Sequence, residues 1–288
     1  MNLLRLIAIF IFSAALISSV ALAQQRANLG NNAALRYWAA FAQTQDSAIT
    51  DEEAKRLNSI LDGTSPYDDS QYKDLVEKNR LALETMARAT TLLNCDWGLD
   101  YQMGTATPVD YVRKALILGR LNVLYAFHLL ISGEKDKAVN VLAAGVRFSH
   151  DVANGGTLFA TLVAKSLLVN HLRAMDFALH VGELSSAQRS VLQNAVARLG
   201  TEGLDWRSAM KRELEIPQDL NPQASSAMAK IVPAYVGALT KPAKLPELQK
   251  MIANAPKQCS DIIPNPQRVL EAKQELTDRL QDIRLKLQ

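Results

Sequence analysis

The sequence lacks the short motifs that identify common enzyme and cofactor sites. It has no HExxH zinc motif, no GxSxG nucleophile turn, no glycine-rich phosphate loop and no dinucleotide fingerprint. The CxxCH signature is also absent, which excludes a c-type haem attached in the usual way. No two of the 4 histidines stand three or four residues apart on a predicted helix. We therefore expect no metal site and no cofactor.

Neither basic nor acidic residues are in large excess. The 288 residues carry a formal net charge of +3, and basic and acidic side chains are interspersed along the chain. Proteins that bind nucleic acid need a basic patch or stripe, so we do not expect nucleic acid as a partner. Hydrophobic residues make up 48% of the chain, which is enough for a folded core.

Long hydrophobic runs are rare, and the clearest one lies at the N-terminus. Arg5 precedes an apolar run over residues 6–20, and Ala21-Leu22-Ala23 places small residues where a signal peptidase cleaves. We predict a signal peptide over residues 1–23, cleaved after Ala23, and a mature protein that is periplasmic or secreted. No later stretch reaches about 18 unbroken apolar residues, so no stable membrane span is expected after cleavage.

The sequence contains two cysteines, Cys95 and Cys259. In an oxidising compartment an even number of cysteines favours pairing, so we expect a Cys95–Cys259 disulfide. Two buried free thiols are the alternative. A catalytic cysteine is not expected, because no histidine lies near either residue in sequence and an exported reactive thiol is open to oxidation.

The alternating pattern typical of strands is absent, whereas helical periods and caps run through the chain, and we predict an all-α fold. Helices are expected over residues 32–45, 70–91, 108–132, 135–153, 157–181, 185–199 and 205–215, with further helices opening at Thr50, Asn221 and Asn265. Thr50 and Ser185 begin capping boxes, and the Thr-Pro pair at 107–108 is another predicted start. Pro233 is expected to kink or split its helix, and KPAKLP, NAPKQ and IIPNP to be loops.

Two helix junctions resemble each other. LLISGEKDKAVNVL and ALHVGELSSAQRSV both show an apolar helix, Gly-Glu, three residues, alanine and a second helix, with their glycines about 50 residues apart. The first resembles a degenerate tetratricopeptide hairpin over about 35 residues. The residues that carry this resemblance are Ala126, Leu129, Gly133, Ala138, Leu142 and Gly145. The resemblance implies an array of antiparallel αα-hairpins, either α-solenoid-like or an irregular helical bundle.

We expect residues 24–200 to form this array and residues 201–288 to form a proline-punctuated helical region packed on it. The last helix carries an apolar stripe on one face, suited to docking within the chain or to a coiled coil. The residues of the stripe are Val269, Ala272, Leu276, Leu280, Ile283 and Leu287.

The stretch NCDWGLDYQMG, residues 94–104, has no helical period and admits two interpretations. It is either a structural connector, with Trp97 and Tyr101 filling space and the aspartates capping turns, or part of a glycan hydrolase site. In the second case Asp96 and Asp100 form the acid–base pair that such hydrolysis requires.

Polar residues interrupt the most apolar helices and gather on one face of the helix between them. Such residues need water, partners or a ligand, because a buried unpaired charge is costly. They form either a solvated face with internal ion pairs, or a polar groove that binds a peptide or an anionic ligand. The candidate ligand-binding residues are Arg120, Asn122, Asn140, Arg147, His150 and Lys165.

Three functions remain open from sequence. The favoured one is an exported, non-catalytic helical-repeat protein of the cell envelope that binds a protein or peptide partner or scaffolds an assembly. The second is an all-α hydrolase that uses Asp96 and Asp100. The third is a structural subunit that assembles through its C-terminal helix.

Overall fold

The computed structural model describes residues 30–45, 50–107, 109–181, 183–216 and 220–288. Within these ranges the chain is helical, and the extended backbone pairs at one isolated bridge, between Asn32 and Asn94. The all-α prediction is therefore confirmed. The predicted signal peptide, residues 1–23, lies outside the described residues.

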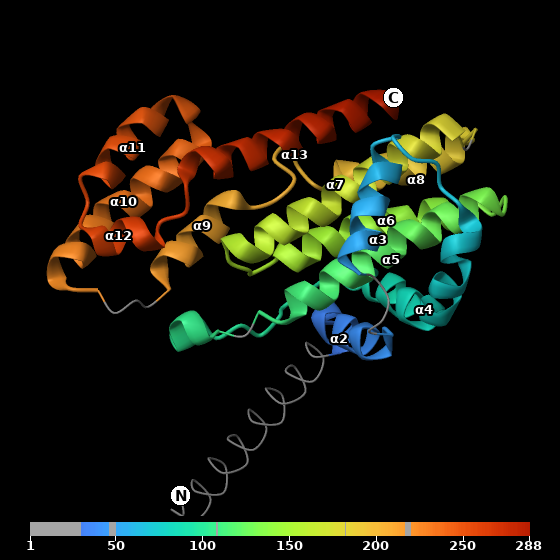
Figure 1. The fold of residues 1–288 in the computed structure, drawn as a ribbon, viewed down its shortest axis with the longest axis horizontal. Coiled ribbons are helices and arrows are strands. Elements are labelled where there is room, and N and C mark those ends of the chain that lie inside the picture. The colour runs from blue at the N-terminus through green and yellow to red at the C-terminus, as the bar shows by residue number, and fades with distance from the viewer. Residues whose placement is uncertain (1–29, 46–49, 108, 182, 217–219) are drawn as a thin grey trace, which may run out of the picture.

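The helices follow one another along the chain in two groups (Figure 1). The first group comprises α2 (Ala33–Gln43), α3 (Asp51–Leu61), α4 (Asp69–Ala89), the 3₁₀ helix η1 (Tyr101–Ala106), α5 (Tyr111–Ile131), α6 (Lys135–Ala153), α7 (Leu158–Val181) and α8 (Ser186–Ala197). The second comprises α9 (Trp206–Glu215), α10 (Pro222–Thr240), the 3₁₀ helix η2 (Pro242–Lys244), α11 (Leu245–Ala253), α12 (Lys257–Ile262) and α13 (Pro266–Lys286).

Several helices begin where their sequence signals predict. At the start of α3 the Thr50 hydroxyl accepts the backbone N–H of Glu53 at 3.2 Å, and the Glu53 carboxylate accepts the N–H of Thr50 at 2.6 Å. Ser185 and Gln188 form the same reciprocal pair before α8. Both capping boxes supply partners to N–H groups that the first helical turn leaves unpaired.

Helix α5 begins at Tyr111, not at the predicted Thr-Pro start. The Thr107 hydroxyl donates instead to the carbonyls of Asp100, at 3.0 Å, and Gly104, at 2.8 Å, and so closes η1. Asp110 occupies the N-cap position without a side-chain hydrogen bond. The prediction was wrong because the preceding turn offers the threonine hydroxyl local acceptors that compete with a capping role.

The C-terminal third is more helical than the sequence suggested. Helix α10 continues through Pro233 and is not split there. KPAKLP forms η2 and the beginning of α11, and NAPKQ leads into α12. Proline is compatible with the first turn of a helix, where its missing N–H removes no intrahelical hydrogen bond. These prolines therefore mark helix starts and not the loops that we predicted.

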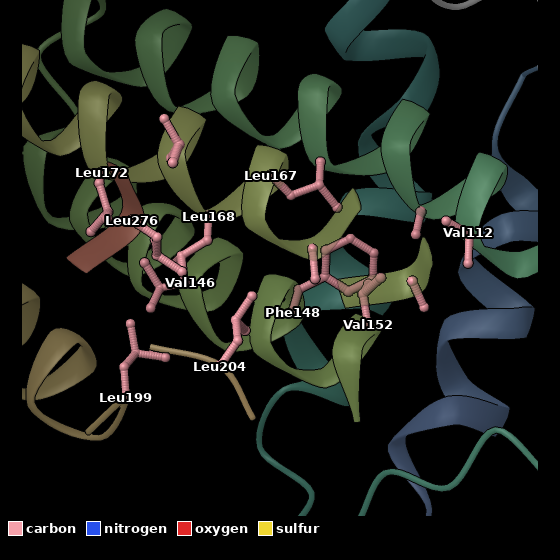
Figure 2. Packing of buried hydrophobic residues seen from close by; sticks show 14 of the residues in the cluster. Val112, Val146, Phe148, Val152, Leu167, Leu168, Leu172, Leu199, Leu204 and Leu276 are labelled. Atoms are coloured by element: carbon pink, nitrogen blue, oxygen red, sulfur yellow. The ribbon is translucent and has the colours of Figure 1, made fainter. Parts of the chain in front are cut away.

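Helix α6 lies at the centre of the fold, packed against α5, α7, α8 and α4. Figure 2 shows Val146, Phe148 and Val152 of this helix within the same buried cluster as Leu167 and Leu168 of α7. Helix α5 is the one described helix that is long and apolar enough to cross a membrane. Since 61% of its most apolar window is buried inside the protein, α5 has the environment of a core helix.

Helix α13 crosses back over the molecule and packs against α7 and α8 (Figure 1). Its apolar stripe is buried there, with Leu276, Leu280 and Ile283 fully covered. Lys273 pairs with Glu202 at 2.7 Å, and the guanidinium of Arg284 donates to the carbonyls of Val196, at the end of α8, and of Gly200. The face that we considered for a coiled coil is thus occupied within the chain.

Helix α9 makes the second junction between the two groups of helices. The Glu213 carboxylate accepts the N–H of Leu158, in the first turn of α7, at 3.0 Å. The Arg212 guanidinium donates to the carbonyl of Gly156 at 2.9 Å. An acidic side chain at a helix N-terminus and a cation on the preceding carbonyl both complement the local backbone charges. The C-terminal helices are therefore fixed to the first group at two separate places.

Candidate functional site

The segment 94–104, here called the connector, joins α4 to α5 and lies against the C-terminal end of α6. The Trp97 indole N–H donates to the carbonyl of Asp151 at 2.8 Å, and the Cys95 sulfur lies 3.7 Å from the same oxygen. The Asn154 side-chain amide donates to the Cys95 carbonyl at 2.7 Å. These bonds to α6 supply the hydrogen-bond partners that regular structure provides elsewhere.

Trp97 fills the space between the connector and two helices. Its ring is 8% exposed and stacks on Tyr111 of α5, with centroids 4.1 Å apart, and on Phe41 of α2, with centroids 6.2 Å apart. Tyr101 is half-buried, and its hydroxyl donates to the carbonyl of Gly155. Both aromatic side chains therefore hold the connector on its neighbours.

The two aspartates considered as an acid–base pair each bind their own turn. Asp96 Oδ1 accepts the N–H of Gly98 at 2.9 Å, and Asp100 Oδ1 accepts the N–H of Gln102 at 3.0 Å. Both aspartates are exposed. This is the bonding of aspartates that stabilise turns, and it favours the connector interpretation over the hydrolase interpretation.

The expected Cys95–Cys259 disulfide is absent from the described structure, where both cysteines are free and buried. Cys95 lies in the connector, whereas the Cys259 sulfur in α12 lies 3.4 Å from the Ala224 carbonyl of α10. The two residues belong to different parts of the core, which an even cysteine count does not reveal. Burial raises the pKa of each thiol, and a raised thiol pKa lowers reactivity.

Asn122, one of the predicted ligand-binding residues, lies in the core. Its side-chain oxygen is 3.0 Å from His171 Nε2, and His171 Nδ1 is 2.8 Å from the Leu167 carbonyl and 3.1 Å from Ser149 Oγ. Burial lowers the pKa of His171 to about 4, because the charged ring is disfavoured away from water. We call this group, where α5, α6 and α7 meet, the buried histidine cluster.

Lys165 and Arg120 are also separate from the other predicted residues. The Lys165 ammonium pairs with the Glu275 carboxylate of α13, so its charge contributes to the docking of that helix. Arg120 is half-buried on α5. Neither residue lines the groove in which the remaining candidates meet.

Asn140, Arg147 and His150 line one groove of about 630 Å³ between α4, α6 and α8, here called the α4/α6/α8 groove. The opposite walls add two threonines that directly follow α4, and Asn194 and Arg198 from the α8 side. Alanine and valine side chains form most of the remaining surface. The predicted polar face of α6 therefore forms one wall of the α4/α6/α8 groove.

Two arginines and a histidine line this groove. Arg147, Arg198 and the His150 ring contribute to its lining, and no Asp or Glu occurs among the described residues that line it. Arg198 is exposed at the C-cap of α8, where a cation complements the negative end of the helix. The remaining polar groups are hydroxyls and amides, which are suited to hydrogen bonding.

A buried carboxylate beside the groove holds Arg147 in place. Asp151 is 1% exposed, and its Oδ2 accepts the Tyr37 hydroxyl at 2.7 Å and the Arg147 Nε–H at 3.1 Å. Arg147 Nη2 also lies 3.4 Å from the Leu93 carbonyl. Burial, together with the negative charge of Asp151, raises the pKa of Tyr37, so this phenol remains a hydrogen-bond donor.

His150 lies next to the same carboxylate but does not bond to it. Its Nδ1 is 3.8 Å from Asp151 Oδ1. Both atoms are buried, and neither meets hydrogen-bond geometry with another described atom, although Asp151 Oδ1 lies 3.0 Å from Arg147 Nε in an ion pair. Buried polar atoms are nearly always satisfied, so His150 Nδ1, which has no such neighbour beyond the carboxylate, is an exception that requires an explanation.

The sequence analysis missed Arg198 and Asp151. The one available signal for Asp151 was its position four residues after Arg147, where opposite charges on a helix meet. Comparisons with protein-family models, with curated proteins and with solved structures find no match. Among the described residues no group of three or more His, Cys, Asp or Glu side chains is placed to hold a metal ion.

Proposed function

We propose that this protein is an exported, non-catalytic binding module of the cell envelope, built from helical hairpins, which holds a peptide or another anionic ligand in the α4/α6/α8 groove. The observation that carries the proposal is the meeting of Arg147, Arg198 and His150 in one groove without an acidic residue in its described lining. Guanidinium groups present several donors in a fixed plane and suit carboxylate and oxyanion ligands.

The arrangement of Arg147 supports binding over simple solvation of a charged face. Its side chain is 32% exposed and is held by Asp151 and by the Leu93 carbonyl. A side chain that is already oriented loses less conformational freedom when a ligand arrives. Asn140 and Asn194 line the same groove and offer both donors and acceptors for the amide groups of a peptide.

The other two functions have less support. Asp96 and Asp100 are engaged in their own turns, and the apolar stripe of α13 is covered by α7 and α8. Assembly through that stripe requires α13 to detach from the fold. Hydrolysis at the connector requires an aspartate to exchange its turn-stabilising hydrogen bond for contact with a substrate.

The experiment measures binding of fluorescently labelled hexaglutamate by anisotropy at low salt. We expect Arg147→Gln and Arg198→Gln each to weaken binding about tenfold, since charge-assisted hydrogen bonds contribute about 1.5–3 kcal/mol each. Arg113→Gln is the matched control, because Arg113 is exposed on α5 and does not line the groove. Equal losses in all three variants would indicate nonspecific attraction and refute the proposal.

A further inference from the structure

We infer that ligand binding in the α4/α6/α8 groove is coupled to the uptake of one proton by His150, and that the bound group carries two negative charges, as phosphate- and sulfate-type oxyanions do. The inference rests on the proposed function, because it concerns the same groove. It starts from His150 Nδ1, a buried atom without a hydrogen-bond partner that lies 3.8 Å from the ion-paired Asp151 carboxylate.

A neutral ring with its proton on Nδ1 donates to Asp151 but presents the Nε2 lone pair to an anion in the groove, so only the imidazolium serves both sides of the ring. In the neutral tautomer with its proton on Nε2, His150 directs a lone pair at Asp151 Oδ1, 3.8 Å away, and no hydrogen bond forms. In the imidazolium form both ring nitrogens are donors. Nδ1–H then donates to the Asp151 carboxylate after a small shift of the ring. Nε2–H remains for a ligand, since the His150 side chain is 39% exposed.

The charges around the groove indicate why the proton arrives together with a ligand. Arg147 and Asp151 form an ion pair, with Arg147 Nε 3.0 Å from Asp151 Oδ1, and their charges offset each other. Arg198, exposed at the groove, adds one positive charge. A protonated His150 adds a second, so the charged groove matches a group with two negative charges.

Charged side chains of both signs surround His150. On its own helix it faces the cation of Arg147 and the carboxylate of Asp151, and from α8 it faces the cation of Arg198. The residues after α4 contribute two threonines, which do not titrate in this range, and the Tyr37 hydroxyl of α2 donates to Asp151. An anion in the groove shifts the protonation of His150 toward the imidazolium, and by linkage the proton strengthens anion binding equally.

The test uses sulfate as the probe, because sulfate keeps two charges between pH 5 and 8 and does not itself titrate. Sulfate is titrated into the ¹⁵N-labelled protein at constant ionic strength, and the dissociation constant follows from the shifts of the groove amides. We expect affinity to increase as pH falls from 8 to 5.5, by up to about tenfold per pH unit where the free His150 is neutral. The imidazole resonances of His150 should titrate at higher pH when sulfate is bound.

Two variants separate the proton effect from simple charge. His150→Gln keeps a polar side chain that does not titrate, and we expect its sulfate affinity to be independent of pH. Arg198→Gln should weaken sulfate binding at every pH and keep the pH slope. A wild-type affinity that does not change with pH, a His150→Gln variant that keeps the slope, or no sulfate binding at all would overturn the inference. The arginine-dependent binding of hexaglutamate is measured separately, so the proposed function stands or fails on its own result.

Discussion

Replacing Gly145 by alanine tests the close contact of helices at the buried histidine cluster. Gly145 lies in the middle of α6, where a built Cβ falls 2.2 Å from the His171 ring and 2.4 Å from Asn122 Oδ1. Real Cβ contacts essentially never fall below 3.0 Å. The methyl group therefore displaces the imidazole, which breaks its hydrogen bond to Asn122, or separates α6 from α7, which breaks the contact between Ser149 and His171.

The expected loss follows from three contributions. Alanine is the better helix former by about 0.5–1 kcal/mol. Overpacking a tight core costs about 1–3 kcal/mol, and leaving buried polar groups unpaired costs about 1–3 kcal/mol more. The balance is a destabilisation of about 2–4 kcal/mol, which lowers the melting temperature of a domain this size by roughly 5–15 °C.

Gly237→Ala is the matched control for helix propensity. Gly237 also lies within a helix, α10, and its built Cβ meets one atom within 4 Å, the end of the Lys244 side chain at 3.9 Å. We expect this variant to be stabilised by about 0.5–1 kcal/mol. Urea unfolding and thermal melts of both variants provide the comparison. If Gly145→Ala gains stability as Gly237→Ala does, the contact between α6 and α7 is not as close as described.

Two further predictions concern stability. Trp97→Ala should lower the free energy of unfolding, measured in urea, by about 3–5 kcal/mol, because it removes a buried aromatic ring. Trp38→Ala should lower it clearly less, because the Trp38 side chain is 40% exposed. Equal losses in the two variants would contradict the connector interpretation. The pKa of His171, lowered to about 4, should make stability decrease with acidity, since the unfolded chain binds a proton more readily than the native state. The free energy of unfolding is unaffected by His171 above about pH 6.5, and it decreases by about 3 kcal/mol as the pH drops from there toward 4. His171→Gln should remove that part of the slope, and an unchanged slope would show that His171 is not its source.

Local sequence signals predicted the helices well because they describe interactions within one helix. The capping boxes at Thr50 and Ser185 and the bounds of α6 depend on neighbours in the chain, and the structure confirms them. Proline was harder to interpret. Pro233 was expected to kink or split α10, and the helix is not split there, since it runs from Pro222 to Thr240. The repeated-hairpin hypothesis stays a prediction, and Gly182 at the second junction lies outside the described residues.

The part of the candidate site that lies on one helix could be predicted from sequence, and the part that comes from other helices could not. Asn140, Arg147 and His150 share a face of α6, and helical spacing alone places them together. Asn122 was assigned to the same surface because its contact with His171 crosses from α5 to α7 and has no mark in the sequence. Arg198 comes from the end of α8, and no local pattern connects it to α6. Contacts between helices decide which polar side chains face solvent and which are buried and hydrogen-bonded in the core.

The proposed groove lies on α6, a helix that packs against α4, α5, α7 and α8. One side of α6 approaches α7 so closely that Gly145 has no room for a side chain, and its C-terminal end is fixed through the Asp151 carbonyl by Trp97. The opposite side presents Arg147 and His150 to the groove. A rigid helix holds binding groups in place better than a loop does. Asp151 links the core to the groove. Its backbone carbonyl accepts the Trp97 indole N–H of the connector, and its carboxylate accepts the Arg147 Nε–H. The packing that stabilises the core therefore also orients Arg147 in the groove.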